Sequence, residues 1–264
     1  MTKNQNKQRF QVLINQRPNS KKVAHYIKSI LIKNGWILDK TAPQYLFIIG
    51  GDGTLVRNLR YYYHKAINIV SINTGNIGFY AHFHRDDFKR FMEDIMNSEN
   101  YSNPYLLEIY VNDKHLNAIN EMTIQSLNTI SIDITINDIF YETCKGTGVM
   151  ICTRTGSTGW GKSVGGAVIM PNVDAYELIE LSPTLHVKNM SVNAPLILNH
   201  RDQINLTKFN SNQRCDLIID GMRVLTVKPH DHIKISLVKS KFKLCFNSGL
   251  QEYISKLQKT FIKI

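Results

Sequence analysis

The sequence lacks the features that mark membrane, disulfide-linked and low-complexity proteins. In its 264 residues, no run approaches the roughly 18 apolar residues that a membrane-spanning helix needs. No apolar stretch near the N-terminus ends in a small-residue cleavage site. The 4 cysteines have neither C-x-x-C nor zinc-type spacing, and there are only 7 prolines and 15 glycines. We therefore expect a cytoplasmic globular protein with no disulfide, no metal-ligating residues and no membrane partner.

Acidic residues are fewer than basic ones, and the excess of basic residues lies at the two ends of the chain. The chain has 21 acidic against 32 basic residues, a net charge of +11. Residues 1–40 carry a net charge of +8 and residues 223–264 carry +7, whereas residues 41–222 carry −4. The middle of the chain is therefore not a basic groove, and we interpret the lysines at the ends as solvated helix faces. We expect no nucleic-acid partner, although an inactive basic binding protein, with salt-dependent binding to nucleic acid, remains an alternative.

The first hundred residues alternate between buried strands and helical patterns. Apolar runs at 10–14, 45–49 and 68–72 predict strands, and the spacing of apolar residues predicts helices at 20–34 and 55–63. The second and third strands run directly into glycine-bearing turns. This order is typical of an α/β domain with a parallel sheet that binds its ligand at the carboxyl ends of the strands.

After about residue 100 the pattern changes to short alternating runs, which predict a β-rich domain. A helical pattern is confined mostly to residues 174–181, and residues 250–264 again read as a helix. We predict two domains, residues 1–100 with the tail 250–264 packing back on them, and residues 101–249, with the site between them. The expected strands of the second domain are 107–111, 130–136, 192–198, 216–219, 224–227 and 233–238.

The turn Gly50-Gly51-Asp52-Gly53-Thr54 follows a predicted strand and precedes a predicted helix. Glycines let backbone N–H groups approach an anion, and the start of the helix adds its positive dipole end. A carboxylate beside a phosphate is unfavourable unless it binds Mg²⁺ or accepts a proton from a hydroxyl nucleophile. Asp52 therefore points to a mechanistic role, and the alternative is a helix cap for a helix that starts at Thr54.

Further motifs follow in a specific order. They are Asn73-Thr-Gly-Asn-Ile-Gly-Phe-Tyr80, Asn120-Glu121, Thr153-Arg-Thr-Gly-Ser-Thr158, Gly165-Gly166 and Asp220-Gly221. Together with the Gly50–Thr54 turn, they resemble the bacterial NAD kinases, over roughly residues 40–225. The resemblance implies an NAD kinase/diacylglycerol kinase-like fold and transfer of the γ-phosphoryl group of ATP, or of polyphosphate, to the 2′-hydroxyl of the adenosine ribose of NAD. It also implies Mg²⁺ bound through the phosphates and a homo-oligomer, a tetramer with sites shared between subunits.

The resemblance assigns roles to individual residues. Asp52 is expected to be catalytic, by accepting or orienting the proton of the ribose hydroxyl. Asn120 and Glu121 are expected to hold the adenosine. The expected cofactor-binding residues are Gly51, Gly53, Thr54, Arg57, Asn73, Phe79, Tyr80, Asn120, Glu121, Lys145, Thr147, Thr155, Thr158, Gly159, Trp160, Ser163, Asp220 and Gly221.

Four residues, at three places in the motifs, depart from the family pattern. Arg154 stands where a proline is usual, Gly159-Trp160 stands where Ala-Tyr is usual, and Thr147 replaces an acid. In the family that acid reaches the nicotinamide portion of a dinucleotide on a neighbouring subunit. The Thr147 contact is therefore expected to be weaker, while Lys145 is still able to approach a phosphate.

A second kinase-type motif arises within the same region. Gly156–Ser163 satisfies the P-loop pattern G-x-x-x-x-G-K-[ST], and Leu217–Asp220 resembles a Walker B strand. Polar residues separate the preceding strand from Gly156, and Gly165-Gly166 makes a poor continuation of a helix. A P-loop NTPase remains the alternative interpretation. In the NAD kinase interpretation, Lys162 is expected to line the site.

Overall fold

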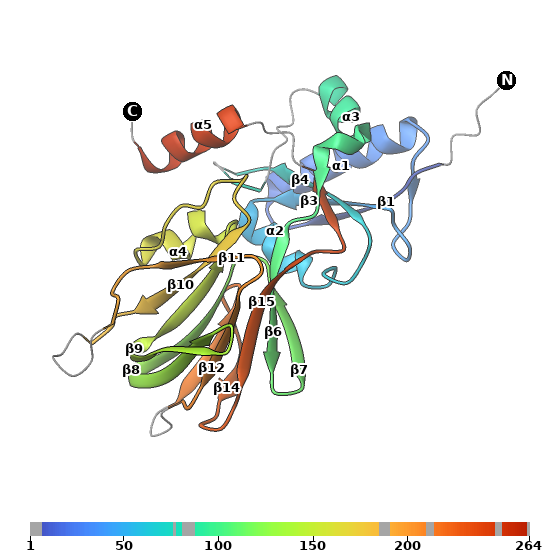
Figure 1. The fold of residues 1–264 in the computed structure, drawn as a ribbon. Helices are drawn as coiled ribbons and strands as arrows, with labels where there is room; N and C mark the ends of the chain where they lie inside the picture. The colour runs from blue at the N-terminus through green and yellow to red at the C-terminus, as the bar shows by residue number, and fades with distance from the viewer. Residues whose placement is uncertain are drawn as a thin grey trace. The chain divides into compact units, whose positions relative to one another are not determined.

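The computed structural model describes residues 7–75, 78–80, 88–184, 191–209, 214–245 and 250–262. The chain divides into two compact units, residues 1–104 with 240–264 (unit 1) and residues 105–239 (unit 2). Figure 1 shows the helices and strands of both units, coloured along the chain and labelled where there is room.

Unit 1 contains a six-stranded sheet in the order β2-β1-β3-β4-β16-β5. The neighbours from β2 to β16 pair in parallel, and β5 pairs antiparallel with β16. The elements of this unit are β1 (Arg9–Ile14), α1 (Pro18–Lys33), β2 (Ile37–Leu38), β3 (Tyr45–Gly50), α2 (Asp52–Leu59), β4 (Asn68–Asn73), α3 (Phe88–Met96), the 3₁₀ turn Ser98–Asn100, β5 (Tyr101–Ser102), β16 (Lys243–Cys245) and α5 (Leu250–Phe261).

Alternation along the central strands explains the core of unit 1. Phe47 and Ile49 of β3 are fully buried in one cluster with the apolar face of α1, which includes Ile27 and Leu31. Leu46 and Ile48, between them in the sequence, are also buried and point to the opposite face. Because both faces of β3 are covered, its sequence is a continuous apolar run, as is usual for central parallel strands.

Unit 2 is dominated by antiparallel pairing, and its longest hairpin joins β8 to β9. The main sheet follows the order β11-β10-β9-β8-β12-β15-β6-β7, and β13 pairs with β8 and with β14. The elements of this unit are β6 (Tyr105–Val111), β7 (Lys114–Ala118), β8 (Glu121–Ile136), β9 (Ile139–Thr153), the 3₁₀ turn Gly156–Thr158, α4 (Trp160–Ser163), β10 (Ala175–Leu181), β11 (Leu196–Asn199), β12 (Gln203–Thr207), β13 (Cys215–Ile219), β14 (Met222–Val227) and β15 (Ile233–Lys239).

The structure confirms the predicted class of each half and corrects two elements. The strand expected at 192–198 is limited to β11, Leu196–Asn199. The segment with a helical pattern at 174–181 is strand β10, which pairs with β9 on one side and β11 on the other. Six of its seven residues are buried, so the two-residue alternation that marks a half-exposed strand is missing. Tertiary pairing therefore decided its structure. No helix among the described residues is long and apolar enough to cross a membrane.

Gly148 in β9 gives a test of how tightly unit 2 is packed. Its φ is +148°, and a Cβ atom there would overlap the carbonyl oxygen of Ile124 on β8. We expect Gly148→Ala to lower the free energy of unfolding by at least about 2 kcal/mol, because it adds a backbone clash to an unfavourable φ.

Gly165→Ala is the control, because Gly165 also has a positive φ, of +92°, but no atom within 4 Å of the added Cβ. It should cost about 1 kcal/mol, from the conformational strain alone. Urea denaturation followed by circular dichroism measures both, and equal losses would show that the clash with β8 is absent.

Candidate functional site

The glycine-rich turn of unit 1 lies where the parallel strand β3 ends. Gly50 pairs with Asn73, the last residue of β4, so the Gly50–Thr54 turn and the segment after Asn73 meet at one edge of the sheet. Gly50 has no room for a side chain, since a Cβ there would overlap the Thr54 hydroxyl. A Cβ on Gly51 or Gly53 would meet no atom within 4 Å. The turn is therefore tight at Gly50 and open at the next two glycines.

Asp52 connects this turn to the segment that follows β4. It is the first residue of α2, and no side-chain hydrogen bond caps that helix at Gly51, so the expectation that Asp52 caps a helix starting at Thr54 is wrong. Its two oxygens accept separate backbone hydrogen bonds, Oδ2 from Phe79 N–H at 2.7 Å and Oδ1 from Tyr80 N–H at 3.2 Å. A Cβ on Gly78 would lie 2.6 Å from Oδ1. This close approach therefore requires glycine at position 78.

Side-chain amides and hydroxyls support the same edge of the sheet. Asn15 at the end of β1 donates to the Thr54 hydroxyl at 3.3 Å. Asn73 Oδ1 accepts the N–H of Gly75 at 2.9 Å, and Asn73 is itself buried. Arg57, one turn into α2, is exposed. These bonds fix the turn between β3 and α2 and the start of the loop after β4.

Sequence reasoning did not single out residues of α5, yet this helix contacts the Asp52 loop. The Phe79 ring stacks on Phe261 and meets Tyr253 edge-on, with ring centroids 5.9 Å apart in both pairs. Lys256 lies on the same helix, with its side chain only 13% exposed. The sequence predicted a helix at the basic C-terminus, but no pattern in it indicated that this helix contacts the Phe79 segment.

In unit 2, Asp220 holds the backbone of the Asn120-Glu121 motif. Asp220 and Gly221 form the two-residue turn between β13 and β14, and both have positive φ, +48° and +73°. The Asp220 carboxylate accepts N–H groups from Ile119, Asn120 and Glu121 at 3.0, 2.8 and 3.3 Å. Asp220 thus positions the backbone of the Asn120-Glu121 pair.

Glu121 is a buried carboxylic acid at the start of β8, with 7% of its surface exposed. Burial, and after it the negative charge of Asp220, raise the pKa of Glu121 to about 7. Near neutral pH its carboxyl group is therefore divided between the protonated and ionised forms.

The threonines after β9 hold the same segment from the other side. The hydroxyls of Thr153 and Thr155 both donate to the carbonyl of Ile119, at 2.6 and 2.9 Å. Thr158 donates to the carbonyl of Thr155 at 3.4 Å. The Asn120-Glu121 and Thr153–Thr158 motifs are therefore neighbours in unit 2, as their resemblance implied.

The Gly156–Ser163 segment does not have the structure of a P-loop. It consists of a 3₁₀ turn and the four-residue helix α4, too short to present a helix dipole to a phosphate. A Cβ on Gly156 would overlap the Asn120 carbonyl, and one on Gly161 would lie 2.8 Å from Cys152 Sγ and 3.3 Å from Glu177 Oε1. Protein atoms thus fill the inner side of this segment. Lys162 and Ser163 are exposed, and Trp160 packs on an apolar cluster that includes Met150 and Ile179.

Lys145 and Thr147 lie apart from these motifs within unit 2. Both are on β9, and Thr147 donates to the carbonyl of Leu181 at 3.1 Å. Thr147 and Thr153 are six positions apart, a distance of about 20 Å at the usual rise along a strand. Unit 2 by itself therefore does not bring them to the Asn120-Glu121 pair.

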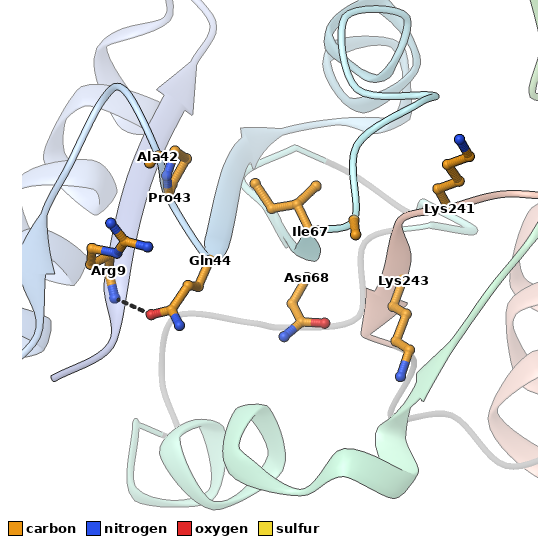
Figure 2. Close-up of a pocket in the computed structure, with 9 residues that line it drawn as sticks. Arg9, Ala42, Pro43, Gln44, Ile67, Asn68, Lys241 and Lys243 are labelled. Atoms are coloured by element: carbon orange, nitrogen blue, oxygen red, sulfur yellow. Dashed lines mark hydrogen bonds between the residues drawn. The ribbon is translucent and has the colours of Figure 1, made fainter. Parts of the chain in front are cut away.

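A hollow of about 480 Å³ lies at the opposite edge of the unit 1 sheet. Figure 2 shows it at the amino ends of β1, β3 and β4, with Arg9 N–H bonded to Gln44. Its cationic side chains, Arg9, Lys241 and Lys243, come from both basic ends of the chain and are exposed to solvent. The lining residues are Arg9, Ala42, Pro43, Gln44, Ala66, Ile67, Asn68, Lys241 and Lys243. The hollow is therefore separate from the Asp52 turn, which lies at the carboxyl edge.

Glu177 gives a pH-dependent test of the packing beneath the Gly161–Ala167 segment. It is fully buried, its Oε2 accepts the N–H of Ala167 at 2.8 Å, and burial raises its pKa to about 7. Between pH 4.5 and 7 the unfolded chain loses this proton before the folded protein does, so stability falls as the pH rises. Glu177→Gln removes this loss. We expect its stability relative to the native sequence to increase by about 2–3 kcal/mol from pH 4.5 to pH 8.

Asp113→Asn, in the exposed β6–β7 turn, is the control and should show no such trend. Denaturation at several pH values measures both. A stability difference for Glu177→Gln that stays constant with pH would contradict the role of a buried, protonated carboxyl group.

Comparison with known families gives an independent result. The family model of the ATP-NAD kinase N-terminal domain matches residues 2–101, and that of the ATP-NAD kinase C-terminal domain matches residues 116–246. The chain is 30% identical over 258 residues to an NAD kinase of Mycoplasma genitalium, covering 97% of this chain and 99% of that protein. It is 31% identical over 244 residues to an NAD kinase of Ureaplasma parvum, covering 92% and 88%.

Solved structures show the same fold. Yeast NADH kinase complexed with NADH superposes with a TM-score of 0.84 at 18% identity, covering 98% of this chain and 89% of that one. An NAD kinase from Archaeoglobus fulgidus in complex with ATP gives 0.74 at 20% identity, covering 95% and 98%. The matches confirm the resemblance seen in the motifs: this chain is a kinase that belongs to the ATP-NAD kinase family.

Proposed function

We propose that the protein transfers the γ-phosphoryl group of ATP to the 2′-hydroxyl of the adenosine ribose of NAD, which produces NADP. The observation that carries the proposal is the Asp52 carboxylate, held by two backbone N–H groups at the end of β3 in a chain of the ATP-NAD kinase family. The related proteins named as NAD kinases, and the structural neighbours named with ATP and with NADH, support the choice of substrates.

The geometry at Asp52 suits the activation of a hydroxyl group. Each carboxylate oxygen accepts one N–H bond from the residues that the structure describes, and its second lone pair can accept a hydrogen bond from the attacking hydroxyl. Phosphoryl transfer has a loose transition state, so positioning matters more than the strength of the base. Two fixed N–H bonds hold the carboxylate in one orientation, and the open positions Gly51 and Gly53 leave room beside it for phosphates.

We further propose that unit 2 binds the adenosine of NAD through Asn120 and Glu121. An ionised Glu121 accepts hydrogen bonds from ribose hydroxyls, and the Asn120 amide can both donate to and accept from the adenine edge. Asp220 also fixes this backbone, and Asp220 and Gly221 keep their expected roles in binding as proposals. The other assigned binding residues of unit 2 keep their expected roles as proposals, namely Lys145, Thr147, Thr155, Thr158, Gly159, Trp160 and Ser163.

Mg²⁺ fits the chemistry of the proposed donor site in unit 1. Mg²⁺ prefers oxygen ligands and is usually bound by one or two carboxylates together with substrate phosphates, and Asp52 is a carboxylate at this turn. When bound, the ion would neutralise charge on the transferred phosphoryl group.

We also propose that the protein is a homo-oligomer, a tetramer, and that it acts in the cytoplasm.

Asp52→Asn tests the proposed reaction. We expect kcat for NADP formation from NAD and ATP to fall by about 100-fold or more, because the amide is a poor acceptor for the hydroxyl proton. The assay measures NADP formed by purified protein in the presence of Mg²⁺, with a thermal melt to show that the variant is folded.

Lys162→Ala is the comparison variant, because Lys162 would be essential in a P-loop enzyme, whereas here it is exposed and expected only to line the site. We expect it to lower kcat far less than Asp52→Asn does, by no more than about tenfold. Loss of ATP use in Lys162→Ala, with Asp52→Asn unaffected, would overturn the proposal in favour of the P-loop reading. Salt-dependent binding of nucleic acid without turnover would instead favour an inactive binding protein.

Glu121 predicts a pH dependence of NAD binding. With a pKa of about 7, it is ionised mostly above neutral pH, and the ionised form is the stronger acceptor for the ribose 3′-hydroxyl, while the 2′-hydroxyl proton goes to Asp52. We therefore expect KM for NAD to rise as the pH falls from 8 to 6. Glu121→Gln should raise KM at pH 8 by about 10- to 100-fold, the effect of losing a charged hydrogen bond, and should flatten the profile. An unchanged profile in Glu121→Gln would exclude this role.

A further inference from the structure

Helix α5 lies outside the part of the chain that the family models describe. The matches cover residues 2–101 and 116–246, and α5 spans Leu250–Phe261. Within unit 1, however, α5 contacts the loop that carries Phe79, through Tyr253 and Phe261. The backbone N–H of Phe79 is bonded to Asp52. Phe79 therefore contacts both α5 and Asp52, the carboxylate assigned to the reaction.

Lys256 is unusually buried for a lysine on this helix. No residue of α5 is fully buried, yet the Lys256 side chain is only 13% exposed. Its Nζ lies 3.3 Å from Oε1 of Glu252, one helical turn earlier and 43% exposed. A pair of this kind on an exposed helix contributes little to stability. It does not by itself explain why the ammonium is withdrawn from water.

The charges around Lys256 place it near the reaction site. Burial lowers the pKa of Lys256, and the carboxylates of Glu252 and Asp52 both act in the opposite direction. The ammonium group thus lies within electrostatic range of Asp52, and two carboxylates favour its charged form.

We propose that Lys256 supplies the cation that the Gly50–Thr54 turn lacks, by binding the phosphate groups of the nucleotide donor beside Asp52. The turn carries a carboxylate where a P-loop would carry a lysine, so the turn itself presents a negative charge to an anionic donor, and Lys256 would act there together with Mg²⁺ bound through the phosphates. An ammonium group has three donors for phosphate oxygens. It would stabilise the charge that develops on the transferred group, and no bond is made to Nζ and no proton leaves it.

This inference rests on the proposed function, and four variants test it. Lys256→Met should lower kcat with ATP by about 100-fold, the usual effect of removing one group that stabilises transition-state charge. It should also raise KM for ATP while leaving KM for NAD unchanged.

The other three variants are controls. Lys256→Arg keeps the charge and should stay within about tenfold of the native kcat. Lys259→Met, an exposed lysine of the same helix, should stay within about twofold. Glu252→Gln removes the helix partner but keeps the ammonium, and should stay within about fivefold.

ATP binding measured by calorimetry on each folded variant provides a readout besides turnover, and Lys256→Gln replaces Lys256→Met if the latter does not fold. The proposal is overturned if Lys256→Met keeps native kcat and KM for ATP, or if Glu252→Gln and Lys256→Met lower activity equally, which would indicate a structural role for the pair. Failure of the native protein to form NADP contradicts the proposed function instead. An active native protein with unaffected Lys256→Met contradicts only the role of Lys256.

Discussion

Both units depend on one kind of interaction, a carboxylate that binds consecutive backbone N–H groups of a distant segment. In unit 1, Asp52 binds the N–H groups of Phe79 and Tyr80. In unit 2, Asp220 binds those of Ile119, Asn120 and Glu121. Hydrogen bonds to an ionised acceptor are roughly twice as strong as those between neutral groups. Each aspartate therefore holds in place the backbone of a segment that is distant in the sequence.

The two carboxylates differ in what their bonds leave available. Among the described residues, Asp52 accepts one N–H bond on each oxygen, which leaves a lone pair on each for a further hydrogen bond. Asp220 accepts three N–H bonds, in a turn whose own backbone has positive φ. The same kind of bond thus leaves acceptor positions open on one carboxylate and fixes the backbone of a motif with the other.

Burial gives unit 2 a second property, carboxyl groups with pKa values near neutrality. Glu121 and Glu177 are both withdrawn from water, and both have pKa values raised to about 7. For Glu121 the negative charge of Asp220 adds to the effect. The arrangement that fixes the Asn120-Glu121 backbone therefore also makes one of its side chains sensitive to physiological pH.

The sequence by itself determined the class of each half, the Gly50–Thr54 turn and the family, because buried strands, glycine turns and short motifs are local patterns. It could not show that residues 174–181 are a strand, since β10 is buried on both faces and its pattern has no two-residue period. Only the tertiary structure brought the N–H groups of Phe79 and Tyr80 to Asp52, and α5 with Lys256 to the same loop. These contacts join residues that are 27 or more positions apart in the sequence, and local periodicity carries no information about which distant segments meet.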